Sequence, residues 1–304
     1  MPKTVLPNRE LPGFGRQRTI RPMNEFAHLN DWLGRVDEAG DVLDRRPSIA
    51  LSATLDRDDP PPVAGDPLPP LWHWLHFLPA ARQSAIGPDG HPQRGGFLPP
   101  VALPRRMWAG GRLEFIQPLR IGDAVKRTSR IVDISARQGR SGALVFVRVR
   151  HEIANGQGVA LTEEHDIVYR DPPEPGAPAE PAKPAPTGEH FARTITPDPV
   201  LLFRYSALTF NGHRIHYDRR YVTEVEGYPG LVVHGPLIAT LLVDLLRRER
   251  PDASLAAFEF RAVSPLFDTA PFTVCGRFDA ARHASLWARG PQGQLAMHAR
   301  ATLA

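Results

Sequence analysis

The sequence predicts an α+β protein made of two similar halves, each a strongly curved antiparallel sheet that wraps around one helix. Three observations predict this architecture: a motif that occurs twice, strand-like runs that follow both copies, and a proline-rich segment between the halves. The chain has 304 residues, which is enough for two domains of about 150 residues each.

The repeated motif is a Glu-Phe pair followed by a Pro-Leu pair and an aspartate. In the first half it reads GRLEFIQPLRIGD, where Glu114 precedes Asp123 by nine positions. In the second half it reads AAFEFRAVSPLFD, where the same nine positions separate Glu259 from Asp268. Self-similarity of this kind indicates a duplicated domain.

Three strand-like runs follow each copy of the motif. In one of them Val145, Val147 and Val149 alternate with larger or charged residues, which is the period-2 pattern of a strand with one buried face. The expected strands are Ala124–Ser135, Ala143–Ile153 and Val159–Tyr169 in the first half, and Phe272–Asp279, Ala284–Arg289 and Leu295–Thr302 in the second.

Each half also has one candidate for the buried helix, ahead of its strands. In the second half Pro236 opens the segment LIATLLVDLLRRE, whose leucines share one stripe. Arg247 and Arg248 lie near its C-terminus, where cations favour the helix dipole. The counterpart in the first half is LWHWLHFL, residues 71–78, a short segment that ends at Pro79.

The domain boundaries follow from composition. Residues 172–186, PPEPGAPAEPAKPAP, contain seven prolines and favour an extended, semi-rigid linker, although a PxxP ligand for a partner domain also fits. We therefore expect a first domain over residues 28–171, a linker over 172–188 and a catalytic domain over 189–304. Residues 1–27 are expected to be a loose tail, with a transit peptide as the alternative.

Composition excludes several classes of protein. A formal charge of +4 with a pI near 9.6 is too modest an excess for a nucleic-acid-binding domain. The single cysteine, Cys275, excludes an internal disulfide and a cysteine-based metal site, and we expect no metal or cofactor. The most apolar stretch, GPLIATLLVDLL, contains Asp244 and is shorter than the ~20 residues of a membrane span. A reducing, cytoplasmic setting is expected.

Residues 202–235 contain the motif that carries information about function, LFRYSALTFNGHRIHYDRRYVTEVEGYPGLVVHG. Asn211 and His216 stand five positions apart in a stretch too polar and kinked for a regular helix or strand. An amide can fix a water molecule, and an imidazole with an ordinary pKa near ~6.5 can take and return its proton near neutral pH. A loop asparagine and a core histidine fit the spacing as well, so both interpretations stay open.

The segment from Leu208 to His216 resembles the hydratase motif of the MaoC-like enoyl-CoA hydratases, roughly (S/T)-G-D-x-N-P-(I/V/L)-H. Thr209, Ile215 and His216 match this pattern. The positions of the family's Gly, Asp, Asn and Pro are held by Phe210, Asn211, His213 and Arg214. This departure, TFNGHRIHYD, resembles the branch that contains hydroxyacyl-thioester dehydratase type 2 and mesaconyl-C4-CoA hydratase. LPPLWHWLHF and GPDGHPQRGGFLPPVALPRRMWAGG in the first half resemble the same branch.

The resemblance covers most of residues 28–304 and implies a double hot-dog fold and a hydro-lyase that adds or removes water across the conjugated double bond of an acyl-CoA thioester. The family's catalytic Asp and His map to Asn211 and His216. Because asparagine does not titrate, we expect His216 to transfer protons and Asn211 to orient the water. Gly235 in VVHGPL is expected to offer a backbone N–H to the thioester oxygen. His234 is a wall residue or a second base.

Arginines are expected to bind the anionic groups of the substrate. The candidates for the phosphates of CoA are Arg105, Arg106, Arg204 and Arg214. Arg214 is also the candidate for a free acyl carboxylate, although an ion pair with a local acidic residue fits equally well.

The remaining polar residues near the motifs have structural interpretations as well. Asp218 is expected to support a helix N-terminus rather than to form a dyad with His216. His213 contacts either the substrate or solvent. His73 and His76 are expected in the core or at its rim rather than as metal ligands.

Three functions are compatible with the motif. The first is a hydratase of mesaconyl-C4-CoA or itaconyl-CoA that gives citramalyl-CoA. The second is a 3-hydroxyacyl-thioester dehydratase of fatty-acid synthesis, acting on acyl-carrier protein or CoA, and the third is a non-catalytic acyl-thioester-binding protein. A long aliphatic chain needs an apolar tunnel, whereas a C5 diacid needs a closed polar end with an arginine. The first half, which lacks the Asn-x4-His arrangement, is expected to shape the cleft, and the resemblance is compatible with a homodimer.

Overall fold

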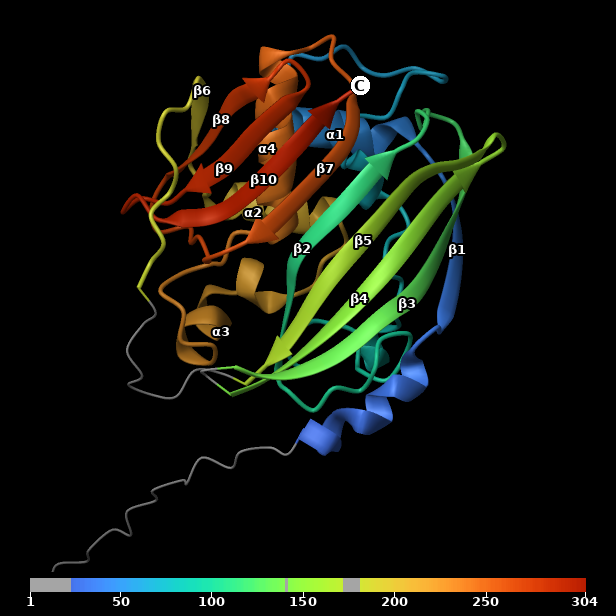
Figure 1. The fold of residues 1–304 in the computed structure, drawn as a ribbon, viewed down its shortest axis with the longest axis vertical. Helices are drawn as coiled ribbons and strands as arrows, with labels where there is room; N and C mark the ends of the chain where they lie inside the picture. Colours follow the sequence, from blue (N-terminus) through green and yellow to red (C-terminus); the bar gives the residue numbers. More distant parts are fainter. Residues whose placement is uncertain (1–22, 140–141, 172–180) are drawn as a thin grey trace, which may run out of the picture.

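The computed structural model describes residues 23–139, 142–171 and 181–304. Ten antiparallel strands form one continuous, strongly curved sheet in the order β1-β3-β4-β5-β2-β7-β10-β9-β8-β6 (Figure 1). The strands of the first half are β1 (Val36–Val42), β2 (Arg105–Phe115), β3 (Ala124–Gly139), β4 (Gly142–Asn155) and β5 (Gly158–Arg170), and those of the second are β6 (Phe191–Ile195), β7 (Leu255–Ala262), β8 (Phe272–Ala280), β9 (His283–Arg289) and β10 (Leu295–Leu303).

The two halves have the same topology, which confirms the predicted duplication. Read from its outer edge inward, the first half has its strands in the order first, third, fourth, fifth, second, and the second half repeats this order. The halves meet where β2 pairs with β7, with Gly111 opposite Phe260. Two separate edges would leave unpaired backbone groups, and this pairing satisfies them by fusing the two expected sheets into one.

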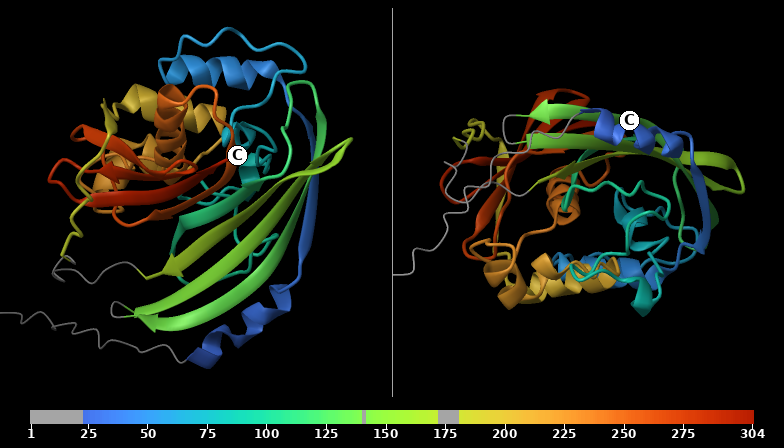
Figure 2. Two further views of the ribbon diagram at one scale, coloured as in Figure 1. Left: turned by 45° about the horizontal axis from the view of Figure 1, so that its top comes forward. Right: turned by 90° about the horizontal axis from the view of Figure 1, so that it is seen from below.

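The α-helices lie on the concave side of this sheet (Figure 2). The first strand of each half is followed by a ten-residue helix, α1 (Arg45–Thr54) or α2 (Pro199–Leu208). Each has an aspartate N-cap, Asp44 or Asp198, whose carboxylate accepts from the first turn. α3 (Arg219–Glu224) is short, whereas α4 (Gly235–Glu249) is the predicted buried helix and packs against β8, β9 and β10.

Among the described residues of the first half, none form a counterpart of α4. The segment expected to form it, residues 71–78, contains only a 3₁₀ turn over Trp72–Leu75. Leu71 and Phe77, on either side of the turn, have φ of 70° and 54°, in the left-handed region that ends a right-handed helix. The concave face of this half is covered instead by coil between α1 and β2 (Figure 2).

The folded part of the first half begins earlier than expected. A 3₁₀ helix over Met23–Trp32 buries Phe26 and Leu29 against β3 and β4, so the last five residues of the expected tail belong to the domain. Of the expected linker, residues 172–180 lie outside the described part of the chain. Its end is attached to the second half, because the Ala185 N–H donates to the Gly293 carbonyl at 2.9 Å.

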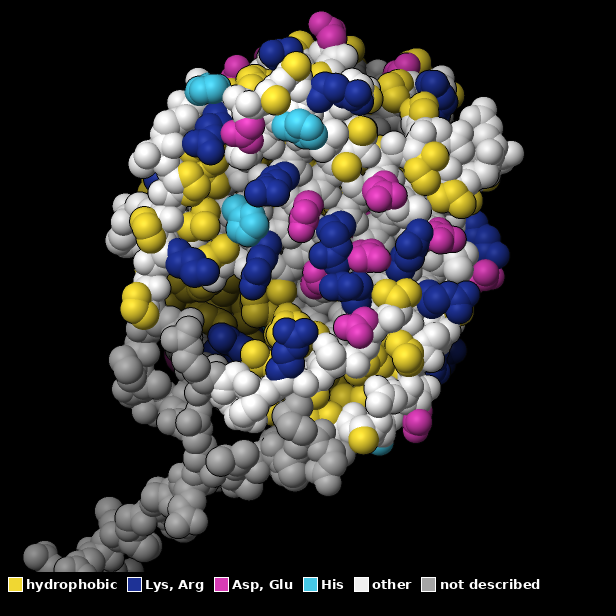
Figure 3. Space-filling view, in the orientation of Figure 1, with side chains coloured by type: hydrophobic (Ala, Val, Ile, Leu, Met, Phe, Trp, Pro, Cys, Tyr) yellow, Lys and Arg dark blue, Asp and Glu magenta, His cyan; other side chains and the backbone are white. Residues whose placement is uncertain are grey.

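Charged groups join the halves and cover the outer face. Asp244 of α4 is buried and pairs with Arg57 of the first half at 2.7 Å and with Arg193 of β6 at 3.2 Å. On the outer face of the sheet basic and acidic side chains are interleaved (Figure 3), as where Arg112 pairs with Glu164 at 3.0 Å. No helix among the described residues is long and apolar enough to cross a membrane.

Candidate active site

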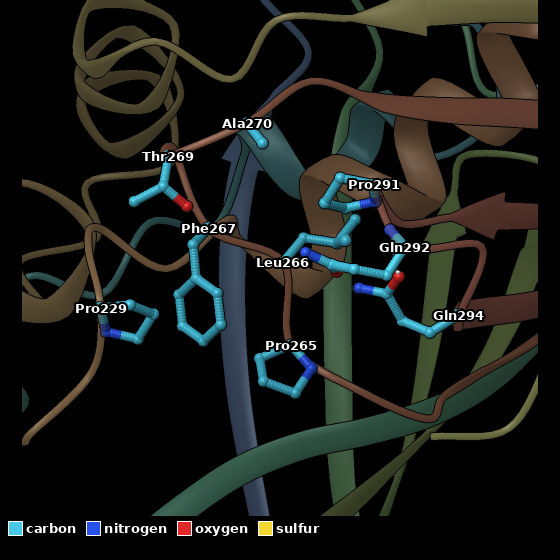
Figure 4. Close-up of a pocket in the computed structure, with 9 residues that line it drawn as sticks. All are labelled: Pro229, Pro265, Leu266, Phe267, Thr269, Ala270, Pro291, Gln292 and Gln294. Atoms are coloured by element: carbon cyan, nitrogen blue, oxygen red, sulfur yellow. Dashed lines mark hydrogen bonds between the residues drawn. The ribbon is translucent and has the colours of Figure 1, made fainter. Parts of the chain in front are cut away.

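A cavity of about 1270 Å³ is lined by residues from both halves. The second half contributes Asn211, Gly212 and Pro236, and the first half contributes most of the remaining wall. A smaller pocket of about 300 Å³ lies elsewhere in the second half (Figure 4) and is lined only by uncharged residues, from Pro229 to Gln294. Because acid–base chemistry needs a titratable group, the larger cavity is the candidate site.

The loop that carries the Asn-x4-His motif begins where α2 ends. Phe210 adopts φ of 48°, the left-handed conformation that explains why the wider family has glycine at this position. The N–H of Asn211 donates to the Ser206 carbonyl at 2.8 Å, and its Oδ1 accepts from the N–H of His213 at 3.0 Å. The side-chain oxygen of Asn211 is therefore occupied by the backbone, and its amide NH₂ is the group left to donate a hydrogen bond.

His216 is held in one tautomer. Its Nδ1 donates to the Val232 carbonyl at 2.7 Å, so Nε2 carries the lone pair. The ring is buried, and burial lowers its pKa to about 4. His216 is thus a neutral imidazole near pH 7, with one nitrogen fixed by the backbone and the other able to take a proton.

His234 lies behind His216. The two rings are stacked with centroids 3.7 Å apart and planes at 18°. Nε2 of His234 is 2.8 Å from the Ser206 hydroxyl, and burial followed by the neighbouring His216 and His213 holds its pKa well below the usual range. Only 1% of His234 is exposed and, like His216, it is not among the residues that line the cavity.

Gly235 is the first residue of α4. A β-carbon added here would meet only the Trp108 carbonyl oxygen, at an ordinary 3.9 Å, so packing does not require a glycine. The N–H groups of a first helical turn have no acceptor within the helix and lie at the positive end of its dipole. Gly235 and His216 are not themselves among the residues that line the cavity, but their neighbours in sequence, Pro236 and Tyr217, are.

A loop of the first half docks against the catalytic motif, which the sequence reasoning did not foresee. The Arg214 N–H donates to the Asp89 carbonyl at 2.9 Å, and a β-carbon on Gly90 would overlap the Gly212 carbonyl oxygen. His91 lies against His213 with ring centroids 3.9 Å apart. The sequence motifs DGHP at residues 89–92 and NGHR at residues 211–214, each with a Gly-His pair, were the available signal.

His213 is enclosed between His91 and His216. Its ring meets that of His216 edge-on at 5.4 Å, and burial together with both histidines lowers the pKa of His213 to about 2. His91 Nδ1 lies 3.1 Å from Asp89 Oδ2. Among the described residues Asp89, His91 and His213 form the one group with metal-ligand spacing, and the two histidine rings are tilted by 39° with respect to each other.

Arg214 is held by protein groups. Its Nε and Nη2 donate to Asp218 Oδ2 at 3.0 and 2.8 Å, and Nη1 donates to the Pro88 carbonyl at 3.0 Å. This is the local ion pair that the sequence left as the alternative to carboxylate binding. Asp218 also accepts from the N–H of Tyr221 at 3.0 Å and caps α3, so its predicted role as helix support is confirmed.

The other candidate arginines differ in their positions. Arg105 pairs with Glu226 at 3.4 Å, and Arg204 is exposed on α2 outside the cavity lining. Arg106 lines the cavity. Of the four arginines considered from the sequence, Arg106 and Arg214 therefore reach the cavity, and only Arg214 is paired with an acid there.

The floor of the cavity in the first half is polar. Glu163 is buried, and its Oε2 accepts from His73 Nε2 at 3.0 Å. Its Oε1 accepts from Trp74 Nε1 at 2.8 Å and lies 2.7 Å from His165 Nε2. Burial alone would raise the pKa of Glu163, but the two histidines outweigh it and hold that pKa well below its usual range. The predicted core position of His73 is thus confirmed, with a carboxylate partner 90 residues away.

The fold and the site define a double hot-dog hydro-lyase of the MaoC-like type. HtdX of Mycobacterium tuberculosis has the same fold, with a TM-score of 0.63 at 18% identity over 88% of this chain and 99% of that one. A second protein of that organism, described as having a double hotdog fold, has a TM-score of 0.59 at 15% identity, over 94% and 99% of the two chains.

The chain belongs to the hydroxyacyl-thioester dehydratase type 2 family, whose profile matches residues 71–268. Mesaconyl-C(4)-CoA hydratase of Chloroflexus aurantiacus is 49% identical over 274 residues, 90% of this chain and 96% of that protein. The mitochondrial hydroxyacyl-thioester dehydratase type 2 of Schizosaccharomyces pombe is 30% identical over 265 residues, 77% and 88% of the two chains.

Proposed function

We propose that the protein is an acyl-CoA hydratase that adds water to mesaconyl-C4-CoA and forms citramalyl-CoA. The observation that carries this proposal is His216, a neutral imidazole whose Nδ1 is fixed by Val232 and which lies near the N-terminus of α4. The identity of 49% with a mesaconyl-C(4)-CoA hydratase over 90% of the chain supports the choice of substrate.

The proposed reaction uses His216 for both proton transfers. Nε2 takes a proton from water, and the resulting hydroxide adds to the β-carbon of the thioester. The electron pair of the double bond moves to the thioester oxygen as an enolate, which a Gly235 N–H and the dipole of α4 stabilise. The imidazolium then returns the proton to the α-carbon, so that one water is added and the histidine is regenerated.

Asn211 has a supporting role in this scheme. Because its Oδ1 accepts from the His213 N–H, it offers the amide NH₂ to the attacking water and cannot act as an acid or base itself. The bond between Nδ1 of His216 and Val232 persists in the imidazolium form and stabilises it.

The polar cavity floor distinguishes between a hydratase of mesaconyl-C4-CoA and a dehydratase of fatty-acid synthesis. A dehydratase of fatty-acid synthesis needs an apolar tunnel for its alkyl chain, whereas Glu163, His151 and His165 line this cavity with buried polar groups. Placing an alkyl chain against such groups removes their hydration without replacing it. The floor therefore favours a short, polar acyl group.

A spectrophotometric assay tests the proposal. Loss of the conjugated thioester absorbance is followed with mesaconyl-C4-CoA, itaconyl-CoA and crotonyl-CoA side by side. We expect the highest kcat/KM with mesaconyl-C4-CoA. Absence of turnover with all three substrates would contradict the hydratase function and favour the non-catalytic binding protein.

A His216→Ala variant tests the proposed base. We expect kcat to fall by about 10²–10⁴-fold, the usual contribution of general acid–base catalysis. His283→Ala serves as the control, because His283 is exposed at the start of β9, outside the cavity lining. Activity of the His216 variant within about tenfold of the wild type would refute the assignment.

A further inference from the structure

We propose that Arg106 binds the free carboxylate of the acyl group and so selects dicarboxylic thioesters. This inference rests on the hydratase function proposed above. It assigns to Arg106 the role that the sequence had suggested for Arg214, which the structure ties to Asp218 and to the Pro88 carbonyl.

The guanidinium of Arg106 has no acidic partner in the described part of the chain. It contacts the hydroxyl of Tyr169, a fully buried side chain of β5 that faces it across the β2–β5 ladder. The adjacent Arg94 is also without a carboxylate, since it donates to the carbonyls of Val101, Leu103 and Pro104. Arg94 is exposed and lies outside the cavity lining, so Arg106 is the arginine that faces the cavity here, with Asp89 as the acidic neighbour of the nearby histidines.

Strand β2 connects Arg106 to the part of the site beside Gly235. Arg106 and Trp108 are two positions apart on β2 and share a face, which separates them by about 7 Å. Both line the cavity, and the Trp108 carbonyl oxygen is the nearest protein atom to a β-carbon placed on Gly235. Arg106 therefore lies on the same face of β2 as the residue whose carbonyl lies beside Gly235, about one strand repeat away from it.

On the other side Arg106 lies near the histidines of the catalytic loop. The positive charge of Arg106 lowers the pKa of His91 and of His213, although burial is the larger cause in both cases. The ring of His213 in turn contacts that of His216 at 5.4 Å. Arg106 is therefore placed between the N-terminus of α4 and the catalytic loop.

This position suits an acyl carboxylate better than a phosphate. In mesaconyl-C4-CoA the free carboxylate is bonded to the same carbon that receives the hydroxyl group, so its anchor must lie beside the reacting atoms. The phosphates of CoA lie at the far end of the pantetheine arm. A guanidinium matches a carboxylate in two parallel hydrogen bonds, which fixes the orientation of the double bond as well as its charge.

The inference is tested with an Arg106→Met variant and three substrates. Mesaconyl-C4-CoA and crotonyl-CoA share the phosphates but differ in the acyl carboxylate, and the N-acetylcysteamine thioester of mesaconate has the carboxylate without phosphates. We expect the ratio of kcat/KM for mesaconyl-C4-CoA over crotonyl-CoA to fall about 100-fold or more, because a polar site discriminates strongly against loss of its partner. The N-acetylcysteamine thioester should lose a similar factor.

Two further variants complete the comparison. Arg106→Lys keeps the charge but loses the two-pronged geometry, and we expect it to retain an intermediate ratio. Arg112→Gln removes an arginine from the same strand whose partners, Glu164 and Asp166, lie on the outer face, and it should leave the ratio unchanged. Thermal unfolding of each variant establishes that it is folded.

Two outcomes would overturn the inference. The first is an unchanged ratio of kcat/KM for mesaconyl-C4-CoA over crotonyl-CoA in Arg106→Met. The second is an equal loss of kcat/KM for both CoA esters with no loss for the N-acetylcysteamine thioester, which would assign Arg106 to a phosphate. Calorimetric titration with mesaconyl-C4-CoA and crotonyl-CoA gives a readout without turnover. If the wild type does not hydrate mesaconyl-C4-CoA, the proposed function fails, while a selective loss of mesaconyl-C4-CoA affinity in Arg106→Met still supports the carboxylate site.

Discussion

Replacing Gly90 by alanine tests whether the contact between the first-half loop and the catalytic loop sets the activity. The new β-carbon would overlap the Gly212 carbonyl oxygen, and the φ of 89° at Gly90 is unfavourable for alanine by about 1–2 kcal/mol. Relieving the overlap requires the two backbones to separate by on the order of 1 Å. Because such a displacement of catalytic groups can cost about 10²-fold in rate, we expect kcat to fall about 100-fold.

Two other glycines separate the contribution of backbone strain from that of steric overlap. Gly95 has nearly the same φ, 90°, but a β-carbon there meets only Pro100 at 3.7 Å, so Gly95→Ala adds strain without overlap. Gly212 has no positive φ, but its β-carbon would lie 2.9 Å from the Gly90 carbonyl oxygen, so Gly212→Ala adds overlap without strain. Steady-state kinetics and thermal unfolding of the three variants should show lower stability in Gly95→Ala with normal kcat, and lower kcat in Gly212→Ala. Normal kcat in Gly90→Ala would refute the reasoning.

Three further predictions concern pH, the helix N-terminus and the cavity floor. Burial lowers the pKa of His216 to about 4, and the neutral form is the base. A pH profile of kcat/KM should therefore stay level from about pH 8 to 6 and fall only below about pH 5, not near ~6.5. Because the unfolded chain binds this proton at a higher pH than the folded chain, His216 also makes the free energy of unfolding fall as pH drops from ~6.5 towards 4. Gly235→Ala should raise the melting temperature slightly, because alanine favours a helix by about 1 kcal/mol and no protein atom obstructs it. Alanine keeps the backbone N–H, so we expect kcat to fall by at least about tenfold only because the added methyl group would occupy space that the thioester oxygen needs to reach this N–H; equal activity would remove Gly235 from the site. Glu163→Gln should destabilise the fold by about 3–5 kcal/mol in denaturant titrations, since it removes a buried charge partner, and a loss below about 1 kcal/mol would show that the floor is hydrated.

The strands were predictable because their pattern is local. Alternation within a strand depends only on which face is buried, and the runs read from the sequence coincide with β3, β4, β5, β8, β9 and β10 to within a few residues at each end. The fusion of the two sheets was not predictable in this way. It depends on the pairing of β2 with β7, two edges about 150 residues apart. Their shared Glu-Phe motif indicates the duplication but does not indicate that the two copies pair with each other.

The helix expected at residues 71–78 shows where local reasoning fails. Its apolar composition favoured a helix, but His73 and Trp74 both bind the carboxylate of Glu163, which lies 90 and 89 residues away. The segment that contacts Glu163 has left-handed conformations at Leu71 and Phe77, and these limit its helix to one turn. In the Asn-x4-His loop the left-handed Phe210 stands where the related motif has glycine, a signal of this backbone conformation that was not used for prediction.

The missing helix of the first half accounts for the asymmetry of the site. In the second half α4 covers the concave face with buried leucines, including Leu237, Leu241 and Leu245, and its N-terminus lies beside His216. An equally long helix in the first half would occupy the space that now forms the cavity of about 1270 Å³. Coil that includes His91 covers part of this face instead, while strands β2 and β5 place Arg106, Glu163 and His165 along the cavity. The second half therefore carries the proposed catalytic residues, and the first half, without a counterpart of α4 among its described residues, forms most of the cavity wall.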